Sequence, residues 1–327
     1  MTYALLPDRN ESNAGLRIAR AELPSLAPNQ VLIDVGAAGV NRADLLQRAG
    51  HYPPPKGAST ILGLEVAGTV IESQHRHWTA GDRVMALLDG GGYSQQAIAE
   101  GELCMPMPQG FDFHQAAATP EAFLTAYQCL VLEGRLVPGQ SVLIHGGAGG
   151  VGHCAIQVAN ALGANVYTTV STDDKAEFVE SLGATPILYH DTDVARSIEK
   201  HTGKRGVDLL LDALGGGALA SNIQCLAVDS TLVNIAMMSG RTASLDFSQM
   251  LKKRITLKSS TLRSRSLMYK SQLVSAFKND VLPLMGQSSI YPRIDGTYHW
   301  LDIDVAHDRM RKNLIKGKVA LAGHWFV

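Results

Sequence analysis

The sequence predicts an α/β protein with two domains. One domain holds a doubly wound parallel sheet of six strands, and the other is rich in β-strands. Three observations support this fold class. A glycine-rich turn joins an apolar strand-like stretch to a helix-like stretch at residues 142–162. Strand-like and helix-like stretches alternate from about residue 141 to residue 260. Short strand-like stretches with glycine turns fill residues 1 to about 120.

The glycine-rich turn has the G-x-G-x-x-G spacing of dinucleotide-binding proteins, at Gly147, Gly149 and Gly152. We expect Gly147 to allow the tight turn, Gly149 to let the backbone approach a pyrophosphate, and Gly152 to let the helix pack on the strand. The helix would then present unpaired N–H groups to phosphate. A structural glycine turn in another α/β protein is the alternative, and the apolar stripe along the helix favours the dinucleotide.

The first part of the chain reads as a series of short strands, with turn-forming residues such as Gly81 and Asp82 between them. Strands are predicted at residues 31–35, 64–71, 83–88 and 93–99. Many short strands with glycine turns indicate a small barrel or sandwich. A helix from about Phe113 to Leu132 is expected to lead into the second domain.

The middle of the chain predicts the parallel sheet. Strands are expected near residues 141–145, 165–170, 186–190, 207–213, 231–236 and 255–260. Helices are expected between them, at residues 174–182, 194–201 and 218–227 among others. In such a sheet the ligand binds at the carboxyl ends of the strands.

The last part of the chain contains helix-like stretches near residues 269–279 and 304–312 and a short strand at residues 318–321. This segment is too small to bury a core of its own, so we expect it to fold back onto residues 1–120. The predicted domains are therefore residues 1–122 with 262–327, and residues 123–261. We expect the ligand site between the two domains.

The composition excludes several classes of partner. The formal net charge is −1, so there is no field of one sign to hold nucleic acid or an anionic membrane. No export signal and no run of about 18 apolar residues is present, so a cytoplasmic protein without membrane contact is expected. The four cysteines are scattered and predict free thiols.

Several separate motifs, in the same order, resemble the zinc-free quinone oxidoreductase branch of the medium-chain dehydrogenase/reductase superfamily. They are Gly39–Leu45, His51–Pro55, Leu62–Gly68, Ala80–Val84, Leu124–Gln128 and Gly146–Gly152. Two stretches, Asn41–Gln47 and Leu262–Arg265, look closest to the subgroup of the p53-inducible quinone oxidoreductase. The resemblance implies a Rossmann dinucleotide-binding domain and a GroES-like substrate domain.

Zinc is not expected, although zinc alcohol dehydrogenases share this fold. A catalytic zinc needs three protein ligands of cysteine, histidine or carboxylate type. Asn41 stands where the zinc-bearing relatives have a cysteine, and Leu64 stands where they have a histidine. The cysteine-rich structural zinc loop is also missing, because Cys104 is the single cysteine between residues 81 and 108.

The resemblance also indicates which nucleotide binds. Ser171, Thr172 and Lys175 follow the second predicted strand and are similar to a G-[ST]-x-x-K motif that holds the 2′-phosphate of NADPH. A phosphate dianion favours hydroxyl donors and an ammonium group. Asp173 and Asp174 are the complication, because they could repel phosphate or accept from a ribose hydroxyl. NADPH is therefore expected, with NADH as the less favoured alternative.

Other residues are implied to line the cofactor path by the same resemblance. They are Asn41, Asp44, Gln128, Gly150 and Val151, then Gly215, Ala236, Met237, Leu262, Arg263 and Asn313 from later segments, with His190 near the adenosine. Some have plainer alternatives. Met237 and Leu262 could be core residues, Gly215 a turn and Asn313 a helix C-cap.

The chemistry implied is hydride transfer from the nicotinamide to a quinone. A quinone is already electrophilic, so the protein has mainly to position the reactants and exclude water. Tyr52, in a loop stiffened by prolines, is expected to contact substrate or nicotinamide, and a packed loop tyrosine is the alternative. Asn41 is expected to hold a ribose or substrate oxygen.

Two other functions stay open: reduction of an enone or alkenal double bond, and NADPH binding without turnover. The basic residues Lys252, Lys253 and Arg254 could be cited for nucleic-acid binding, but a solvated helix face is the simpler interpretation. A homodimer is expected, because the apolar strands at residues 232–236 and 255–260 would lie at the edge of the sheet, where a second copy can pair.

Overall fold

The computed structural model describes residues 1–7, 15–286 and 290–322 of the chain. The chain forms two compact units, which confirms the predicted α/β class with a second, β-rich domain. Unit 1 contains residues 1–124 and 263–327, and unit 2 contains residues 125–262. Each unit has its own hydrophobic core. No helix within these described ranges is long and apolar enough to cross a membrane.

Unit 2 contains a parallel sheet of six strands in the order β10-β9-β8-β11-β12-β13. The strands are β8 (Ser141–His145), β9 (Asn165–Val170), β10 (Thr185–Leu188), β11 (Val207–Asp212), β12 (Leu226–Asn234) and β13 (Thr256–Ser259). The chain runs outward from β8 to β10 and then returns to β11 on the other side of β8. This reversal is where sheets of this kind bind their ligands, at the carboxyl ends of the strands.

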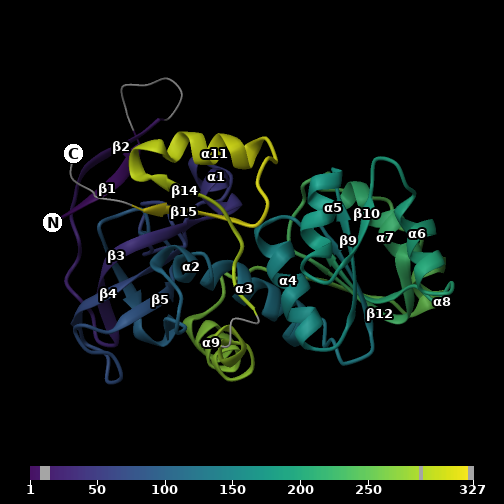
Figure 1. Ribbon diagram of the computed structural model, residues 1–327, viewed down its shortest axis with the longest axis horizontal. Helices are drawn as coiled ribbons and strands as arrows, with labels where there is room; N and C mark the ends of the chain where they lie inside the picture. Colours follow the sequence, from purple (N-terminus) through teal and green to yellow (C-terminus); the bar gives the residue numbers. More distant parts are fainter. Residues whose placement is uncertain (8–14, 287–289, 323–327) are drawn as a thin grey trace. The chain divides into compact units, whose positions relative to one another are not determined.

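The central strands of unit 2, β8 and β11, are buried on both faces and are rich in apolar residues. Every residue of β8 is buried, as a parallel strand covered by helices on both sides requires. The covering helices are α4 (Gly150–Ala161), α5 (Asp173–Glu180), α6 (Val194–His201), α7 (Leu219–Cys225) and α8 (Phe247–Lys253). Helices α6 and α7 lie side by side (Figure 1) and pack Ile198 and Ile223 against Leu210 in the core.

Unit 1 is built on a mostly antiparallel sheet of seven strands, β14-β15-β3-β4-β5-β7, with β6 also pairing with β3. Its strands are β3 (Gln30–Val40), β4 (Glu65–Ser73), β5 (Arg83–Leu87), β6 (Gln96–Glu100), β7 (Cys104–Pro106), β14 (Ile294–His299) and β15 (Lys318–Ala322). A separate hairpin joins β1 (Thr2–Pro7) to β2 (Leu16–Ala21). Strand β15 pairs with β3 (Figure 1), so the C-terminal segment does return to the N-terminal part of the chain.

Helices and short turns complete unit 1. They are α1 (Arg42–Arg48), η1 (Gly101–Leu103), α2 (Phe113–Ala117), α3 (Pro120–Tyr127, which continues into unit 2), α9 (Leu267–Asp280), α10 (Leu282–Gly286), η4 (Trp300–Asp302) and α11 (Ile303–Arg311). Tyr93 and Trp300 are fully buried in the core that these elements cover.

Three predictions about elements were wrong. The single helix expected at residues 113–132 is three segments, α2, α3 and the π-helix η2 (Gln128–Glu133), because Pro120 restricts the residue before it and starts a new helix. The strand expected from Tyr93 begins at Gln96 instead. Strand β12 lies inside the sheet, between β11 and β13, so only β13 forms the edge expected for both.

Candidate active site

The glycine-rich turn connects β8 to α4 and differs in one detail from the prediction. Gly146 has a positive φ of 70°, so it makes the tight turn that we assigned to Gly147. A Cβ on Gly147 would lie 2.0 Å from the Thr168 hydroxyl oxygen on β9. Gly147 therefore lacks a side chain because the neighbouring strand approaches it closely.

The other two glycines lie where the backbone of the turn and the start of α4 come close together. A Cβ on Gly152 would lie 2.3 Å from the Gly146 carbonyl oxygen, so a side chain would push α4 away from the turn. Gly149 is the N-cap of α4, and a Cβ there would meet only the Gly146 carbonyl oxygen, at 3.2 Å. The first N–H groups of α4, starting at Gly150 and Val151, have no partner within the helix. These residues fit a pyrophosphate group at the helix N-terminus.

A buried histidine below the turn was not singled out from the sequence. His145 Nε2 lies 2.7 Å from Asn222 Oδ1, and its Nδ1 lies 3.0 Å from the Thr169 hydroxyl. Burial lowers the pKa of His145, so the ring is neutral, with Nε2 donating to Asn222 and Nδ1 accepting from Thr169. The Thr169 oxygen in turn accepts from the Gly146 N–H at 3.1 Å. This chain of hydrogen bonds fixes the turn.

The residues expected to choose the nucleotide lie at the carboxyl end of β9. The Lys175 ammonium is 3.4 Å from the Ser171 hydroxyl, so the two are together, as a 2′-phosphate site requires. Thr172 is the N-cap of α5, and its hydroxyl donates to the Asp174 carboxylate. Asp173 and Asp174 are both exposed in the first turn of α5. The group therefore combines a buried ammonium with carboxylates at its rim.

Gly215 and three other residues assigned to the cofactor path in unit 2 occupy different environments. Gly215 has a φ of 80° and donates its N–H to the Asp212 carboxylate, which matches the turn alternative. Met237 is 57% exposed, so its alternative as a core residue is wrong, whereas Leu262 is buried. The carbonyl of Ala236 accepts from Asn234.

His190 and Gln128 are the remaining assigned residues of unit 2. His190 is exposed beyond β10 and packs on the Tyr189 ring, with centroids 4.3 Å apart. Gln128 is buried in η2, and its amide nitrogen donates to the Ser260 hydroxyl and to the Thr261 carbonyl. Its side-chain oxygen is buried and has no hydrogen-bond partner among the described residues, which leaves an acceptor for a ligand donor.

In unit 1, Asn41 is held by a buried ion pair. Lys318 Nζ lies 2.6 Å from Glu65 Oε1, and both side chains are almost completely buried. The Asn41 amide donates to Glu65 at 2.8 Å, and its oxygen accepts from Lys318 at 2.6 Å. Both ends of the amide are thus engaged, so the ion pair fixes its orientation. Its contact with a ribose or substrate oxygen stays a prediction.

The side chains of Asn41 and Leu64 do not fit a zinc site. Asn41 offers an amide and Leu64 an alkyl group, neither of which supplies the thiolate or imidazole that zinc prefers. Across the described parts of the chain, no three His, Cys, Asp or Glu side chains come together as a group that could hold a metal ion.

Asp44 stabilises the start of α1 through buried hydrogen bonds. It is fully buried, and its carboxylate accepts from the N–H groups of Asn41 and Gly63 and from the Tyr93 hydroxyl. Burial raises the pKa of Asp44 to about 6, against these hydrogen bonds, which lower it. The carboxylate closes the start of α1 and ties it to two loops, and its expected cofactor contact stays a prediction.

Tyr52 and Arg263 lie together. The Arg263 guanidinium sits over the Tyr52 ring at 5.5 Å, and it donates to the Asp89 carbonyl at 2.6 and 2.9 Å. No hydrogen bond or ion pair of the Tyr52 hydroxyl occurs within the described residues, and burial raises its pKa. The phenol is therefore a protonated donor, held by Arg263 from one side of its ring.

Glu121 was not identified from the sequence. It is the second residue of α3, and its backbone N–H donates to Glu65 Oε2 at 2.8 Å. Burial, followed by the nearby charge of Glu65, raises the pKa of Glu121 to about 8. An acid that stays protonated at neutral pH is a candidate proton donor. An acidic residue at a helix start is so common that the sequence carried no special signal.

Asn313, the last residue assigned to the cofactor path, follows α11. Its φ of 57° places it in the left-handed region that ends many helices. The helix C-cap alternative therefore accounts for its conformation.

Comparison with known proteins identifies relatives over the whole chain. The Zinc-binding dehydrogenase family model matches residues 150–279, and the Alcohol dehydrogenase GroES-like domain model matches residues 27–109. The synaptic vesicle membrane protein VAT-1 homolog of Rattus norvegicus is 32% identical over 320 residues, which are 91% of this chain and 78% of that protein. The highly-reducing polyketide synthase 1 of Aureobasidium melanogenum is also 32% identical, over 305 residues, and this chain spans 14% of its length.

Solved structures match both units together. A quinone oxidoreductase of Pseudomonas syringae pv. Tomato DC3000 is 25% identical, with a TM-score of 0.86 over 99% of this chain and 100% of that one. A mycobacterial protein complexed with NADPH is 26% identical, with a TM-score of 0.86 over 99% and 100%. CurK enoyl reductase is 26% identical, with a TM-score of 0.85 over 98% and 99%. The chain therefore belongs to the medium-chain dehydrogenase/reductase superfamily of oxidoreductases.

Proposed function

We propose that this protein is an NADPH-dependent reductase that transfers hydride to a quinone without a metal ion. The observation that carries the proposal is the Lys175 ammonium beside the Ser171 hydroxyl, one strand away from the glycine turn. A pyrophosphate on the turn and a 2′-phosphate on Lys175 would use both groups. The similarity to a quinone oxidoreductase and to a protein complexed with NADPH supports the same assignment. Within the superfamily, we place the chain in the p53-inducible subgroup.

The bound nicotinamide would supply the hydride, and the residues of this chain position the reactants. The N–H groups at the start of α4 would hold the pyrophosphate, and Lys175 would hold the 2′-phosphate. Tyr52 has a protonated hydroxyl, which donates a hydrogen bond to the acceptor oxygen as charge develops there. Asn41, oriented by Glu65 and Lys318, presents its second amide hydrogen to a ribose or substrate oxygen.

A second candidate is reduction of an enone double bond, and Glu121 favours it. Hydride addition to an enone must be completed by a proton, and a neutral carboxyl group can donate one. Burial keeps Glu121 protonated up to about pH 8. The similarity to CurK enoyl reductase and to a highly-reducing polyketide synthase supports this alternative.

The two candidates are separated by NADPH consumption with an ortho-quinone, a para-quinone and an alkenal. We expect the quinones to be reduced fastest, and fast alkenal reduction that declines above pH 8 and is lost in Glu121→Gln would favour the second candidate. NADPH binding without consumption of any acceptor would contradict both. Metal analysis of the active protein should find no stoichiometric zinc.

We also propose a homodimer that pairs through β13, the edge strand of the unit 2 sheet. Leu257 on this strand is 39% exposed, and α8 exposes Phe247 and Leu251 by 70% and 77%. Apolar side chains of this size on the surface are typical of interaction sites. Light scattering should give the mass of a dimer, and a monomer would contradict this proposal. A cytoplasmic location stays a prediction from the sequence.

A further inference from the structure

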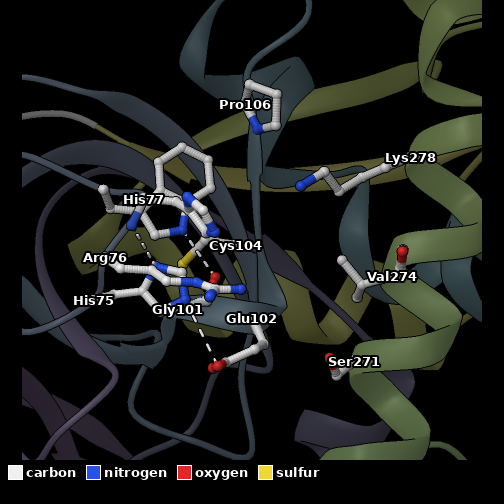
Figure 2. Close-up of a pocket in the computed structure, with 12 residues that line it drawn as sticks. His75, Arg76, His77, Gly101, Glu102, Cys104, Pro106, Ser271, Val274 and Lys278 are labelled. Carbon is white, nitrogen blue, oxygen red and sulfur yellow. Dashed lines mark hydrogen bonds and ion pairs between the residues drawn. The ribbon is translucent and has the colours of Figure 1, made fainter.

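Unit 1 contains a cavity that no residue of the proposed active site lines. Its volume is about 390 Å³, within the range of small-molecule sites. Figure 2 shows His75, Arg76, His77, Glu102 and Cys104 on one wall, and Ser271, Val274 and Lys278 of α9 on the opposite wall. The lining residues come from the turn after β4, from η1 and β7, and from α9.

The inner surface of the cavity is apolar and chemically inert. The Trp78 indole is fixed by a hydrogen bond from its N–H to the Gly101 carbonyl at 2.8 Å. Pro106 and Val274 add further apolar surface. Cys104 is buried, and burial raises the pKa of its thiol far above neutral pH, so the thiol stays protonated and unreactive. This surface suits a ring rather than a reactive group.

Two exposed cations and one carboxylate line the cavity, and His75, His77, Ser271 and Ser275 add further polar groups. Arg76 and Lys278 form no hydrogen bond or ion pair with other described residues, although both line the cavity. Figure 2 shows the Lys278 ammonium directed toward the opposite wall. Glu102 has one oxygen 3.6 Å from the His75 ring, whereas its other oxygen is buried without a partner in the described residues. The two cations therefore favour an anionic ligand in this cavity.

The wall formed by α9 is held in place before any ligand arrives. Phe277 packs on Phe123 of α3, with ring centroids 6.4 Å apart. Lys270, which is buried, forms an ion pair with Asp89 at 2.6 Å. These contacts lie on residues of α9 that do not line the cavity, so α9 presents Val274 and Lys278 from a fixed position.

We propose that this cavity binds a small aromatic carboxylate. The carboxylate lies between Arg76 and Lys278, where two unpaired cations attract it. The ring lies on the apolar surface beside Trp78. This site is separate from the proposed reductase function and does not depend on it.

The test is titration of the full chain, saturated with NADPH, with 4-hydroxybenzoate and with its neutral analogue 4-hydroxybenzyl alcohol. Calorimetry should give at least tenfold tighter binding of the carboxylate. The NMR signal of the Trp78 indole, assigned with Trp78→Phe, should shift on binding. Equal affinity for the two compounds, or a shift confined to other residues, would overturn the proposal.

Variants that remove charges test which side chains bind the ligand carboxylate. Arg76→Gln with Lys278→Gln should weaken 4-hydroxybenzoate binding at least tenfold, with little effect on the neutral analogue or on NADPH consumption. Lys200→Gln removes an exposed lysine of unit 2 and should leave binding unchanged. Glu102→Gln keeps the size of the side chain, removes its negative charge and should strengthen binding of the anion severalfold. Unchanged binding in the double variant would show that the carboxylate is held elsewhere.

Discussion

The residues assigned to the active site are held in different ways in the two units. In unit 2, the glycine turn uses backbone groups of consecutive residues, Gly146 to Gly152, between one strand and one helix. In unit 1, Asn41 is oriented by side chains from β4 and β15, which lie 24 and 277 residues away in the sequence. A group of consecutive backbone atoms can therefore be recognised in a sequence as a motif. Side chains that come together from distant parts of the chain leave no such motif.

The largest expected effect is a loss of stability when the buried ion pair that orients Asn41 is broken. Lys318→Met leaves Glu65 as a buried carboxylate without its cation, which should cost about 3–5 kcal/mol of unfolding free energy. Chemical denaturation measures this loss. The matched control is Lys312→Met, which removes an exposed ion pair with Asp308 and should change stability by less than about 0.5 kcal/mol. Similar losses for the two variants would show that the buried pair has no special role.

The next largest effect is a loss of NADPH affinity when the glycine turn of unit 2 is altered. Gly152→Ala puts a Cβ at 2.3 Å from the Gly146 carbonyl oxygen, so the turn or α4 has to move. NADPH binding should weaken on the order of 100-fold, equivalent to about 2.7 kcal/mol, as measured by calorimetry. Gly286→Ala is the control, because no atom of the described residues lies within 4 Å of a Cβ at that position. Normal NADPH affinity in Gly152→Ala would show that the glycine turn does not bind the nucleotide.

Stability measured as a function of pH tests whether Glu121 is protonated in the folded protein. Its pKa is about 8 in the folded protein and about 4.5 when the chain unfolds, so the folded state holds a proton that the unfolded state releases between these values. Stability should therefore fall as pH rises toward 8, by roughly 2 kcal/mol between about pH 5 and about pH 6.5. Glu121→Gln should flatten this decline, and Glu121→Asp, which keeps a carboxyl group, should retain it. A slope unaffected by Glu121→Gln would mean that the carboxyl group is already ionised in the folded state.

A smaller effect concerns the choice of nucleotide. Lys175→Gln removes the ammonium beside Ser171 and should weaken NADPH binding about tenfold, near 1.4 kcal/mol, with little change for NADH. Binding of both nucleotides, measured side by side, gives the ratio. Lys200→Gln serves as the control with an exposed lysine. An equal loss for NADPH and NADH would indicate that Lys175 supports α5 and does not contact the 2′-phosphate.

The smallest effect is expected at Tyr52. Tyr52→Phe keeps the ring beneath Arg263 and removes only the hydroxyl, so kcat with a quinone should fall about two- to fivefold. Steady-state kinetics measures the change. Complete loss of turnover would show that Tyr52 is an essential proton donor, and positioning alone would then be an insufficient account of catalysis.

The sequence by itself determined the alternation of strands and helices in unit 2, the place of its glycine turn and the return of the C-terminal strand to unit 1. Periodicity, glycine spacing and the small size of the last segment are local properties, so they can be read without a structure. The sequence could not show that Gly146, and not Gly147, makes the turn, because the approach of Thr168 is a tertiary contact.

Only the tertiary structure decided which polar groups act together. The Glu65–Lys318 pair, the neutral His145 and the protonated Glu121 all depend on burial and on partners brought from other elements. Burial changes the free energy of a charge by more than any neighbour along the chain does, and no local pattern records it. For this reason the position of the glycine turn could be predicted from spacing, whereas the protonation of Glu121 could not.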